Sequence, residues 1–256
     1  MPRPLKYDLL RRNRPALPLD LKTPAAIEFT LDLVADSDIL IEGFRPGVTE
    51  RLGLGPSVCL ERNPRLVYGR MSGYGQSGPQ AQEVGHDLNY IALTGALHAI
   101  GRAGGAPTPP INLVGDFAGG ALYLVLGILA ALHERQHSGL GQVIDAAMVD
   151  GVANLMTQVH GTYAAGLMST DRGTNPTDSG APFYEVYQCA DGHWISLAPV
   201  EKKFYEQALR ILELPELLEE QWDRSRWPAA KARIARAVRT RTRAQWVSAF
   251  EGVEAC

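Results

Sequence analysis

The sequence predicts an α/β fold, in which helices are layered on a parallel β-sheet. Segments with helical and strand-like patterns alternate along much of the 256-residue chain, which is typical of this class. Residues 38–42 contain a short, continuous apolar run of the kind found in buried parallel strands. A linker-like stretch at 170–182, rich in Gly, Thr, Asp, Asn and Pro, precedes a hairpin signal. We therefore expect a large domain over residues 1–180 and a small α+β domain over residues 181–256.

The N-terminal half is expected to supply helices and strands in turn. Thr23-Pro24 is a preferred N-cap followed by a proline at the first helical position, and apolar residues then recur at helical spacing to about Ala35. The strand at 38–42 is followed by Arg45-Pro46-Gly47, which predicts a turn. The further elements expected are a helical segment near 49–52, a strand over 65–71, and helices from His86-Asp87 and from Asp116 to about Glu134, separated by a Gly- and Pro-rich loop at 101–110.

The C-terminal half is expected to add a strand, helices and the hairpin. A strand-like piece at 143–145 precedes a helical stretch over 148–163. Residues 183–197 are typical of a hairpin that turns at Asp191-Gly192, a two-residue turn signal. Beyond Glu201 the pattern is helical, and the Arg-rich stretch 224–243 has spacings that suit a solvated helix face.

Composition and charge exclude several classes of protein. The net charge of −3 and the pI near 6.1 argue against nucleic-acid binding, which needs clustered positive charge. Met1–Arg14 lacks the apolar region of a secretory signal, and the most apolar stretch, 117–132, is shorter than the roughly 20 residues that span a bilayer. The three cysteines are far apart and form no CxxC pair. We expect a cytoplasmic protein that acts on a small molecule, with a buried core helix at 117–132 and no nucleic-acid or membrane partner.

Two ionisable residues stand immediately before predicted helices, in GHDLNY (from Gly85) and NLVGDFAGG (from Asn112). A helix N-terminus stabilises a developing anion, and the same field keeps a histidine neutral and able to act as a base. His86 and Asp116 are therefore candidate acid/base groups. Taken alone, each also has an ordinary interpretation: Asp116 as an N-cap that contributes about 0.5–2 kcal/mol, and His86 as a hydrogen-bonded structural residue.

Two other patterns offer alternative chemistry. His133-Glu134-Arg135-Gln136-His137 matches the HExxH zinc motif, with Glu185 as a distant candidate for the third ligand. Its place at the end of an apolar helix, before Ser138-Gly139, instead favours helix-terminal cations and a closing glycine, so we expect no metal site. Arg45 and Arg51 flank a turn after a strand, where α/β sheets tend to bind ligands, and arginine suits bidentate phosphate contact.

The combination of segments resembles the α-methylacyl-CoA racemase group of the class III (CaiB/BaiF) CoA-transferase superfamily. The resemblance is carried by IEGFRPGVTERLGLGP (from Ile41), GRMSGYGQSGP (from Gly69), GHDLNYIALTGALHAIGR (from Gly85), PPINLVGDFAGG (from Pro109) and GQVIDAAMVDG (from Gly141). It runs nearly continuously from about Leu10 to the C-terminus. It implies a Rossmann-like large domain with a parallel sheet, a small domain, and an interlocked homodimer with active sites between its subunits.

The resemblance also implies a site and a reaction. His86 would be the catalytic base and Asp116 the partner acid, with Asn112 orienting Asp116 and Glu201 supporting His86. CoA would be bound by Asp20, Leu21, Lys22, Gly43, Arg45, Arg51, Gly85, Asp87 and Tyr90. The substrate would be a 2-methylacyl-CoA of fatty-acid metabolism, inverted through an enolate, with CoA as part of the substrate and no resident cofactor.

Two departures from the family pattern leave alternatives open. The first βα unit with its glycine-containing loop, and the C-terminal arm that returns to the large domain, are expected to be missing from this chain, which would expose a sheet edge. The chain is then either a racemase or a truncated, inactive relative that binds CoA. A CoA-transferase in which Asp116 acts as a nucleophile and forms a mixed anhydride is the remaining alternative.

Overall fold

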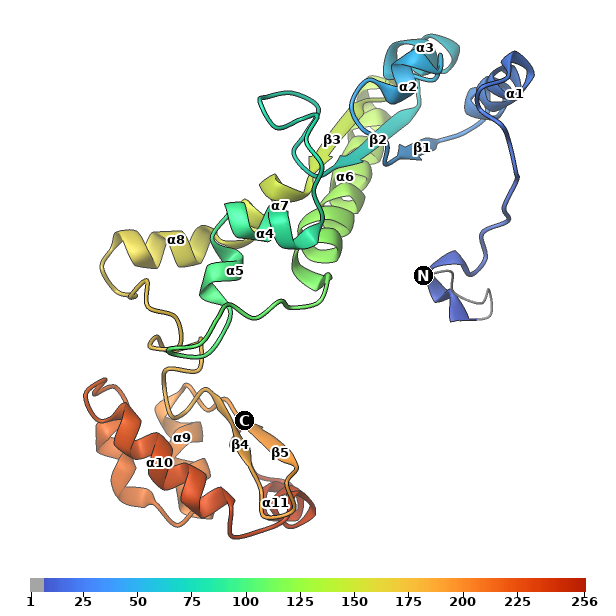
Figure 1. Cartoon of the computed structure of the whole chain (residues 1–256). Coiled ribbons are helices and arrows are strands. Elements are labelled where there is room, and N and C mark those ends of the chain that lie inside the picture. Colours follow the sequence, from blue (N-terminus) through green and yellow to red (C-terminus); the bar gives the residue numbers. More distant parts are fainter. Residues whose placement is uncertain (1–6) are drawn as a thin grey trace. The chain divides into compact units, whose positions relative to one another are not determined.

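The structure is a computed structural model that describes residues 7–256 (Figure 1). The first six residues of the predicted large domain, 1–180, lie outside the described part. Contacts divide the chain into two compact units. The first unit holds the described residues up to Ser72, Gln76–Gln82 and Leu124–Ala146, and the second holds Gly73–Gly75, Glu83–Tyr123 and Ala147–Cys256. The boundary predicted at residue 180 comes from the composition of the linker-like stretch and not from contacts, and it stays a prediction.

A three-stranded sheet organises the first unit, in the order β1-β2-β3. Strand β1 (Ile39–Glu42) pairs in parallel with β2 (Val67–Ser72), so that Ile39 lies opposite Val67. Strand β3 (Val143–Ala147) follows on the other side of β2. The parallel pairing of the first two strands confirms this part of the expected α/β architecture.

Helices cover the two faces of this sheet unequally. On one face, α1 (Pro24–Ala35) and α3 (Pro56–Arg62) bury Val34 and Cys59 against Leu66 and Tyr68. On the other face, α6 (Tyr123–Ser138) packs Leu124 and Ile128 against Val67 of β2 and Ala146 of β3. Residue patterns predicted α1 well, because Thr23 caps it as expected by accepting from the N–H of Ala26.

The expectation that strand 38–42 is buried is wrong for this chain. Ile39 is 37% exposed and Ile41 is 56% exposed, while Leu40 between them packs beside the α1 and α3 cluster. Side chains alternate across a strand, so the two isoleucines share the face that α6 covers only over β2 and β3. Strand β1 is an edge strand of this three-stranded sheet.

Short helices build the first part of the second unit: α4 (Asp87–Leu93), α5 (Ala96–Ala99), α7 (Met148–Leu155) and α8 (Thr157–Ala164). Helices α4 and α7 lie side by side (Figure 1). A π-helix, η3 (Leu113–Leu122), passes directly into α6. It touches α7 so closely that a Cβ on Gly151 would lie 1.9 Å from the carbonyl oxygen of Gly119. Glycine at both positions permits this backbone contact.

The helix that runs through η3 and α6, Leu113–Ser138, is the described helix that is long and apolar enough, by length and composition, to cross a membrane. It includes the apolar stretch 117–132. Its sheet-facing residues are buried, whereas Leu122, Leu126 and Leu129 are exposed. The expectation of a buried core helix therefore holds for one of its faces only.

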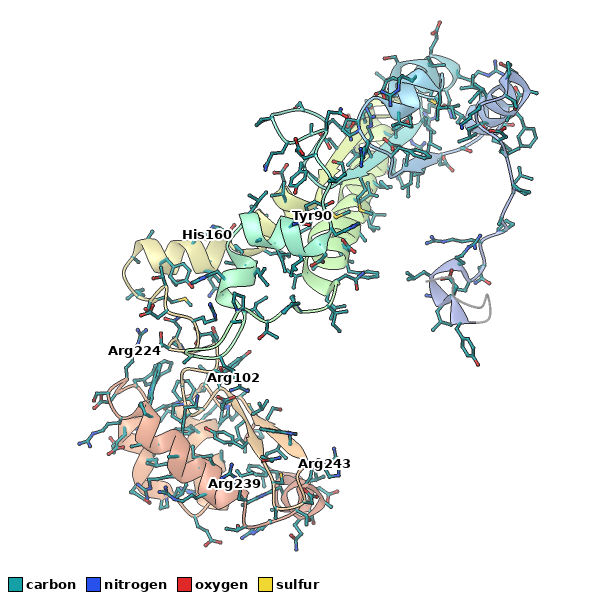
Figure 2. The ribbon with its side chains drawn as sticks, viewed as in Figure 1. Tyr90, Arg102, His160, Arg224, Arg239 and Arg243 are labelled. Atoms are coloured by element: carbon teal, nitrogen blue, oxygen red, sulfur yellow. The ribbon has the colours of Figure 1, made fainter. Side chains whose placement is uncertain are left out.

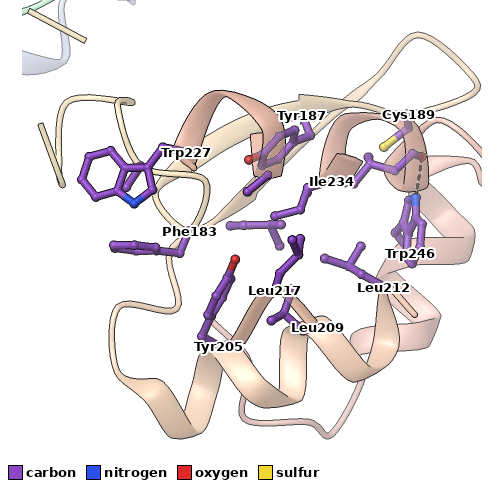
Figure 3. Close-up of a cluster of buried hydrophobic side chains, with 14 residues drawn as sticks. Phe183, Tyr187, Cys189, Tyr205, Leu209, Leu212, Leu217, Trp227, Ile234 and Trp246 are labelled. Atoms are coloured by element: carbon purple, nitrogen blue, oxygen red, sulfur yellow. Dashed lines mark hydrogen bonds between the residues drawn. The ribbon is translucent and has the colours of Figure 1, made fainter. Parts of the chain in front are cut away.

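The C-terminal part of the second unit has a core of its own (Figure 3). Strands β4 (Glu185–Gln188) and β5 (Trp194–Leu197) form the predicted antiparallel hairpin, although its turn has three residues, with Gly192 in the left-handed region at φ 79°. The helices that follow are α9 (Lys202–Ile211), the 3₁₀ turn η4 (Pro215–Glu220), α10 (Trp227–Val238) and α11 (Arg243–Phe250). The indole of Trp246 donates to the carbonyl of Val238 at 2.7 Å, the dashed line in Figure 3.

Candidate active site

His86 stands at the N-cap of α4, as the sequence predicted. Its backbone is extended, and its N–H donates to the side-chain oxygen of Asn89 at 3.0 Å. This bond caps the first turn of the helix and so fixes the backbone position of His86 at the helix start. The His86 residue is exposed, so its imidazole is accessible to a substrate.

Asp116 lies in the first turn of η3 and is half-buried. The N-cap of η3 is Asn112, so the interpretation of Asp116 as a simple N-cap is wrong. The amide Nδ2 of Asn112 donates to Oδ2 of Asp116 at 3.1 Å. The structure thus joins the two residues that were expected to act together, because a π-type first turn places residues four apart on one side.

Asp87 connects the two segments that carry these residues. It is 6% exposed, and its Oδ2 accepts from the backbone N–H of Gly115 at 2.7 Å and of Asp116 at 2.8 Å. Residues 86–87 and 115–116 are therefore adjacent, although they are far apart in sequence. Asp87 was expected to be among the residues that bind CoA, and this role stays a prediction; its carboxylate accepts from these two amides.

Tyr90 was also expected to contact CoA, and its ring is buried against glycines. The Tyr90 side chain is labelled in Figure 2. Its hydroxyl donates to the carbonyl of Gly85, and its ring meets that of Tyr74 edge-on, with centroids 5.0 Å apart. A Cβ on Gly73 would lie 2.3 Å from the Tyr90 ring. Burial raises the pKa of the Tyr90 hydroxyl, and the charges of Tyr74 and Asp116 add to this effect. Tyr90 therefore supports the backbone just before His86.

An ion cluster in the first unit adjoins the predicted CoA loop: the buried Arg70 pairs with the buried Glu42 and with the partly exposed Glu50. Arg70 donates through Nε to Glu42 and through Nη1 to Glu50, each at 2.8 Å. The second oxygen of Glu42 accepts from the N–H of Phe44 at 2.6 Å. Burial opposes the charge of Arg70, but its hydrogen bonds with Glu50 and Glu42 raise its pKa. The cluster anchors the chain on both sides of the loop at 43–47, which carries two of the expected CoA residues.

Five other expected CoA residues lie in the first unit: Asp20, Leu21, Lys22, Arg45 and Arg51. Arg45 and Arg51 are exposed on either side of the turn and α2 (Val48–Arg51), where Gly47 adopts φ 82°. Asp20 accepts from the N–H of Lys22 at 3.1 Å in a turn that leads into α1, and Leu21 between them is half-buried. The side chains of these arginines and Lys22 are thus accessible to phosphate groups.

Glu201 is the predicted catalytic residue that the single chain does not bring to His86. It is exposed at the N-cap of α9, where its carbonyl accepts from Phe204 and Tyr205. Among residues 7–256, no hydrogen bond or ion pair joins Glu201 to His86. Its supporting role stays a prediction.

Side chains of the HExxH motif form hydrogen bonds with neighbouring protein groups. Glu134 accepts from Ser138 and Gln142, and the His137 ring lies 3.3 Å from the carbonyl of His133. Glu185, its distant candidate ligand, is buried and paired with Arg102 and Lys231. Arg102 and Glu185 line a cavity of about 630 Å³, whose lining includes none of the predicted catalytic or CoA-binding residues.

Comparisons with known proteins agree on the relatives of this chain. The sequence profile of CoA-transferase family III matches residues 3–256. The chain is 44% identical to the α-methylacyl-CoA racemases of Mus musculus and Homo sapiens, over 97% and 98% of its length. It spans 66% of each of those proteins, about two thirds of their length. A solved structure, that of Rv3272 from Mycobacterium tuberculosis, superimposes with a TM-score of 0.71 at 30% identity, covering 91% of this chain and 62% of that one.

Proposed function

Because the chain belongs to CoA-transferase family III, we propose that it is a racemase or epimerase that interconverts (R)- and (S)-2-methylacyl-CoA thioesters. One observation carries the proposal: the hydrogen bonds of Asp87 place the backbone of His86 beside that of Asp116. The 44% identity to two proteins named as α-methylacyl-CoA racemases supports the choice of reaction. The acyl chain is expected to belong to fatty-acid metabolism.

The two side chains divide the proton transfers. Neutral His86 removes the α-proton from one face of the thioester, and the C–H electron pair moves into an enolate. Protonated Asp116 delivers a proton to the opposite face of the same carbon, which inverts the centre. Each positioned acid or base typically contributes about 10² to 10⁴ in rate. The backbone N–H of Asp87, at the start of α4, is the proposed donor to the enolate oxygen.

CoA itself is proposed to bind the exposed cations of the first unit. Arg45 and Arg51 present guanidinium groups suited to phosphate, and Lys22 adds a third cation. Asp20, Leu21, Gly43, Gly85, Asp87 and Tyr90 complete the proposed set, with Asp87 and Tyr90 contributing through their own main-chain groups. No resident cofactor or metal is proposed, since the reaction needs only acid and base groups.

We further propose that the working protein is an interlocked homodimer in the cytoplasm. Active sites between subunits would offer Glu201 of one copy a route to His86 of the other. The large domain, 1–180, and the small domain, 181–256, would be the two parts of each subunit. The buried cluster confined to 181–250 supports an independent core for the smaller part.

Deuterium incorporation distinguishes the racemase from its rivals. In deuterated water, the racemase should place deuterium on the α-carbon of 2-methylacyl-CoA without any acceptor acid. A transferase that uses Asp116 as nucleophile requires an acceptor and gives an enzyme adduct that hydroxylamine traps. A truncated relative would bind CoA in calorimetry and show neither reaction.

Variants of the two groups test the assignment. His86→Ala and Asp116→Ala should each abolish racemisation, because inversion needs a proton-transfer group on each face of the carbon and each variant removes one of the two. The matched controls are His137→Ala and Asp150→Asn, which change exposed residues outside the site. Normal turnover by His86→Ala or Asp116→Ala would reject the assignment.

A further inference from the structure

Asp87 is a buried carboxylate that the proposed proton transfer does not use. Its Oδ2 accepts from two successive backbone N–H groups, those of Gly115 and Asp116, at 2.7 and 2.8 Å. Next to it in sequence is His86, the proposed base. We propose that Asp87 is a positioning residue, which sets the separation of His86 and Asp116 by holding the first turn of η3 against the first turn of α4. This inference rests on the racemase function proposed above.

The contact fits aspartate at one end and glycine at the other. A Cβ on Gly115 would lie 2.7 Å from Oδ2 and 2.8 Å from Cγ of Asp87. A side chain at 115 would therefore push the carboxylate away from the amides. A longer acid at 87 would meet the same backbone and displace it. The hydrogen bonds therefore require an aspartate at position 87 and a residue without a side chain at position 115, which explains the glycine directly before Asp116.

The second oxygen of Asp87 points to a role beyond stability. Oδ1 is buried and has no hydrogen-bond partner among residues 7–256. A group retained only for stability would gain from pairing both oxygens, since an unsatisfied buried acceptor is unfavourable. The arrangement instead concentrates both bonds on one oxygen, which fixes the positions of residues 115 and 116 together.

Burial also separates this role from CoA binding. With 6% of the residue exposed, the Asp87 carboxylate is turned inward, away from solvent. Loss of the Asp87 carboxylate should therefore reduce turnover without weakening the binding of CoA. A displacement of about 1 Å in a catalytic group is enough to reduce rate by about 10²-fold.

The test compares Asp87→Asn and Asp87→Ala with wild type and with the exposed control Asp150→Asn. Three quantities are measured: kcat and KM for α-deuterium incorporation, the Kd of free CoA by calorimetry, and the hydrogen exchange of the Gly115 and Asp116 amides. We expect kcat to fall by about 10²-fold in Asp87→Ala and less in Asp87→Asn, which keeps one acceptor oxygen. The Kd of CoA should stay unchanged, and the two amides should exchange faster. Gly115→Ala, which displaces the carboxylate from the other side, should reproduce the loss if Asp87→Ala does not fold.

Each contrary result has a distinct meaning. A raised Kd for CoA with unchanged kcat would show that the Asp87 carboxylate itself contacts CoA and would overturn the proposal. Lower thermal stability with unchanged kcat would leave only a structural role and overturn it as well. If wild type incorporates no deuterium, the racemase function fails. Unchanged exchange of the Gly115 and Asp116 amides in Asp87→Ala would independently reject the claim that the Asp87 carboxylate holds this segment.

Discussion

Glu42 in the first unit and Asp87 in the second are both buried carboxylates, 7% and 6% exposed, and each holds a loop of the proposed site. Glu42 is neutralised by the guanidinium of Arg70 at 2.8 Å and also accepts from the N–H of Phe44. Asp87 has no such cation among its described hydrogen bonds and accepts from two backbone amides at the start of a helix. The same chemical group is therefore stabilised in two different ways.

The difference indicates what each region contributes. An ion pair in the interior is costly to break, because the remaining charge is left without compensation. A carboxylate that accepts from backbone amides instead fixes the position of its own segment relative to the segment that carries those amides. We expect changes around Glu42 to appear mainly as lost stability and changes at Asp87 mainly as lost turnover.

Arg70→Met should have the largest effect on stability. It leaves the Glu42 charge buried without its cation, and breaking a buried pair typically costs about 3–5 kcal/mol. Urea unfolding followed by circular dichroism measures the loss. Arg62→Met, which breaks an exposed ion pair with Asp32 in the same unit, should cost less than about 1 kcal/mol. Equal losses in the two variants would contradict the distinction between buried and exposed pairs.

Asp87→Asn should lower the free energy of unfolding by a smaller amount, about 1–2 kcal/mol, because neutral acceptors bind amides more weakly than a carboxylate does. The same unfolding experiment measures it. A loss as large as that of Arg70→Met would remove the contrast between the two carboxylates, since Asp87 would then be chiefly a stabilising group.

Arg45→Ala should weaken CoA binding by about 10-fold, the equivalent of one charge-assisted phosphate contact. Calorimetry with free CoA gives the Kd. The matched control is Arg62→Ala, which removes an exposed arginine of α3 that is outside the proposed site. An unchanged Kd in Arg45→Ala would show that the loop anchored by Glu42 and Arg70 does not bind CoA.

Glu50 should give the smallest effect, and it depends on pH. Its hydrogen bond from Arg70 lowers its pKa below the usual 4.5. A group with a depressed folded pKa stabilises the protein above its unfolded pKa, and this contribution disappears as pH falls below about 4.5 toward the folded value. Because the Glu50 side chain is 44% exposed, we expect about a few tenths of a kcal/mol. The difference in unfolding free energy between wild type and Glu50→Gln should thus be largest near pH 7 and shrink as pH falls below about 4.5; a constant difference would contradict the assignment.

Local patterns predicted much of the fold. Thr23-Pro24 marks the start of α1 because capping is a local interaction, and the apolar run at 38–42 marks a parallel strand because strand period is local too. The exposure of Ile41 could not be predicted in this way, since it depends on how far α6 extends across the sheet. Helix α3 and the π-type turns of η3 were also missed.

The sequence displays the candidate reacting residues, whose roles stay predictions, but it does not indicate the side chains that hold their segments in place. His86, Asp116 and Asn112 stand in short motifs that the sequence displays directly. The partners of the Asp87 carboxylate are 28 and 29 positions away, and those of Arg70 are 28 and 20 positions away. No periodicity spans such distances. The available signals were a charge directly after His86, a glycine directly before Asp116, and an arginine inside an otherwise apolar strand.

The most direct test of the central claim follows each pure enantiomer of a 2-methylacyl-CoA in deuterated water. Wild type should convert either enantiomer into its mirror form with deuterium on the α-carbon, because His86 and Asp116 serve opposite faces of one carbon. His86→Ala and Asp116→Ala should produce no inverted product from either enantiomer, while His137→Ala behaves as wild type. Inversion at the wild-type rate by His86→Ala or by Asp116→Ala would contradict the account.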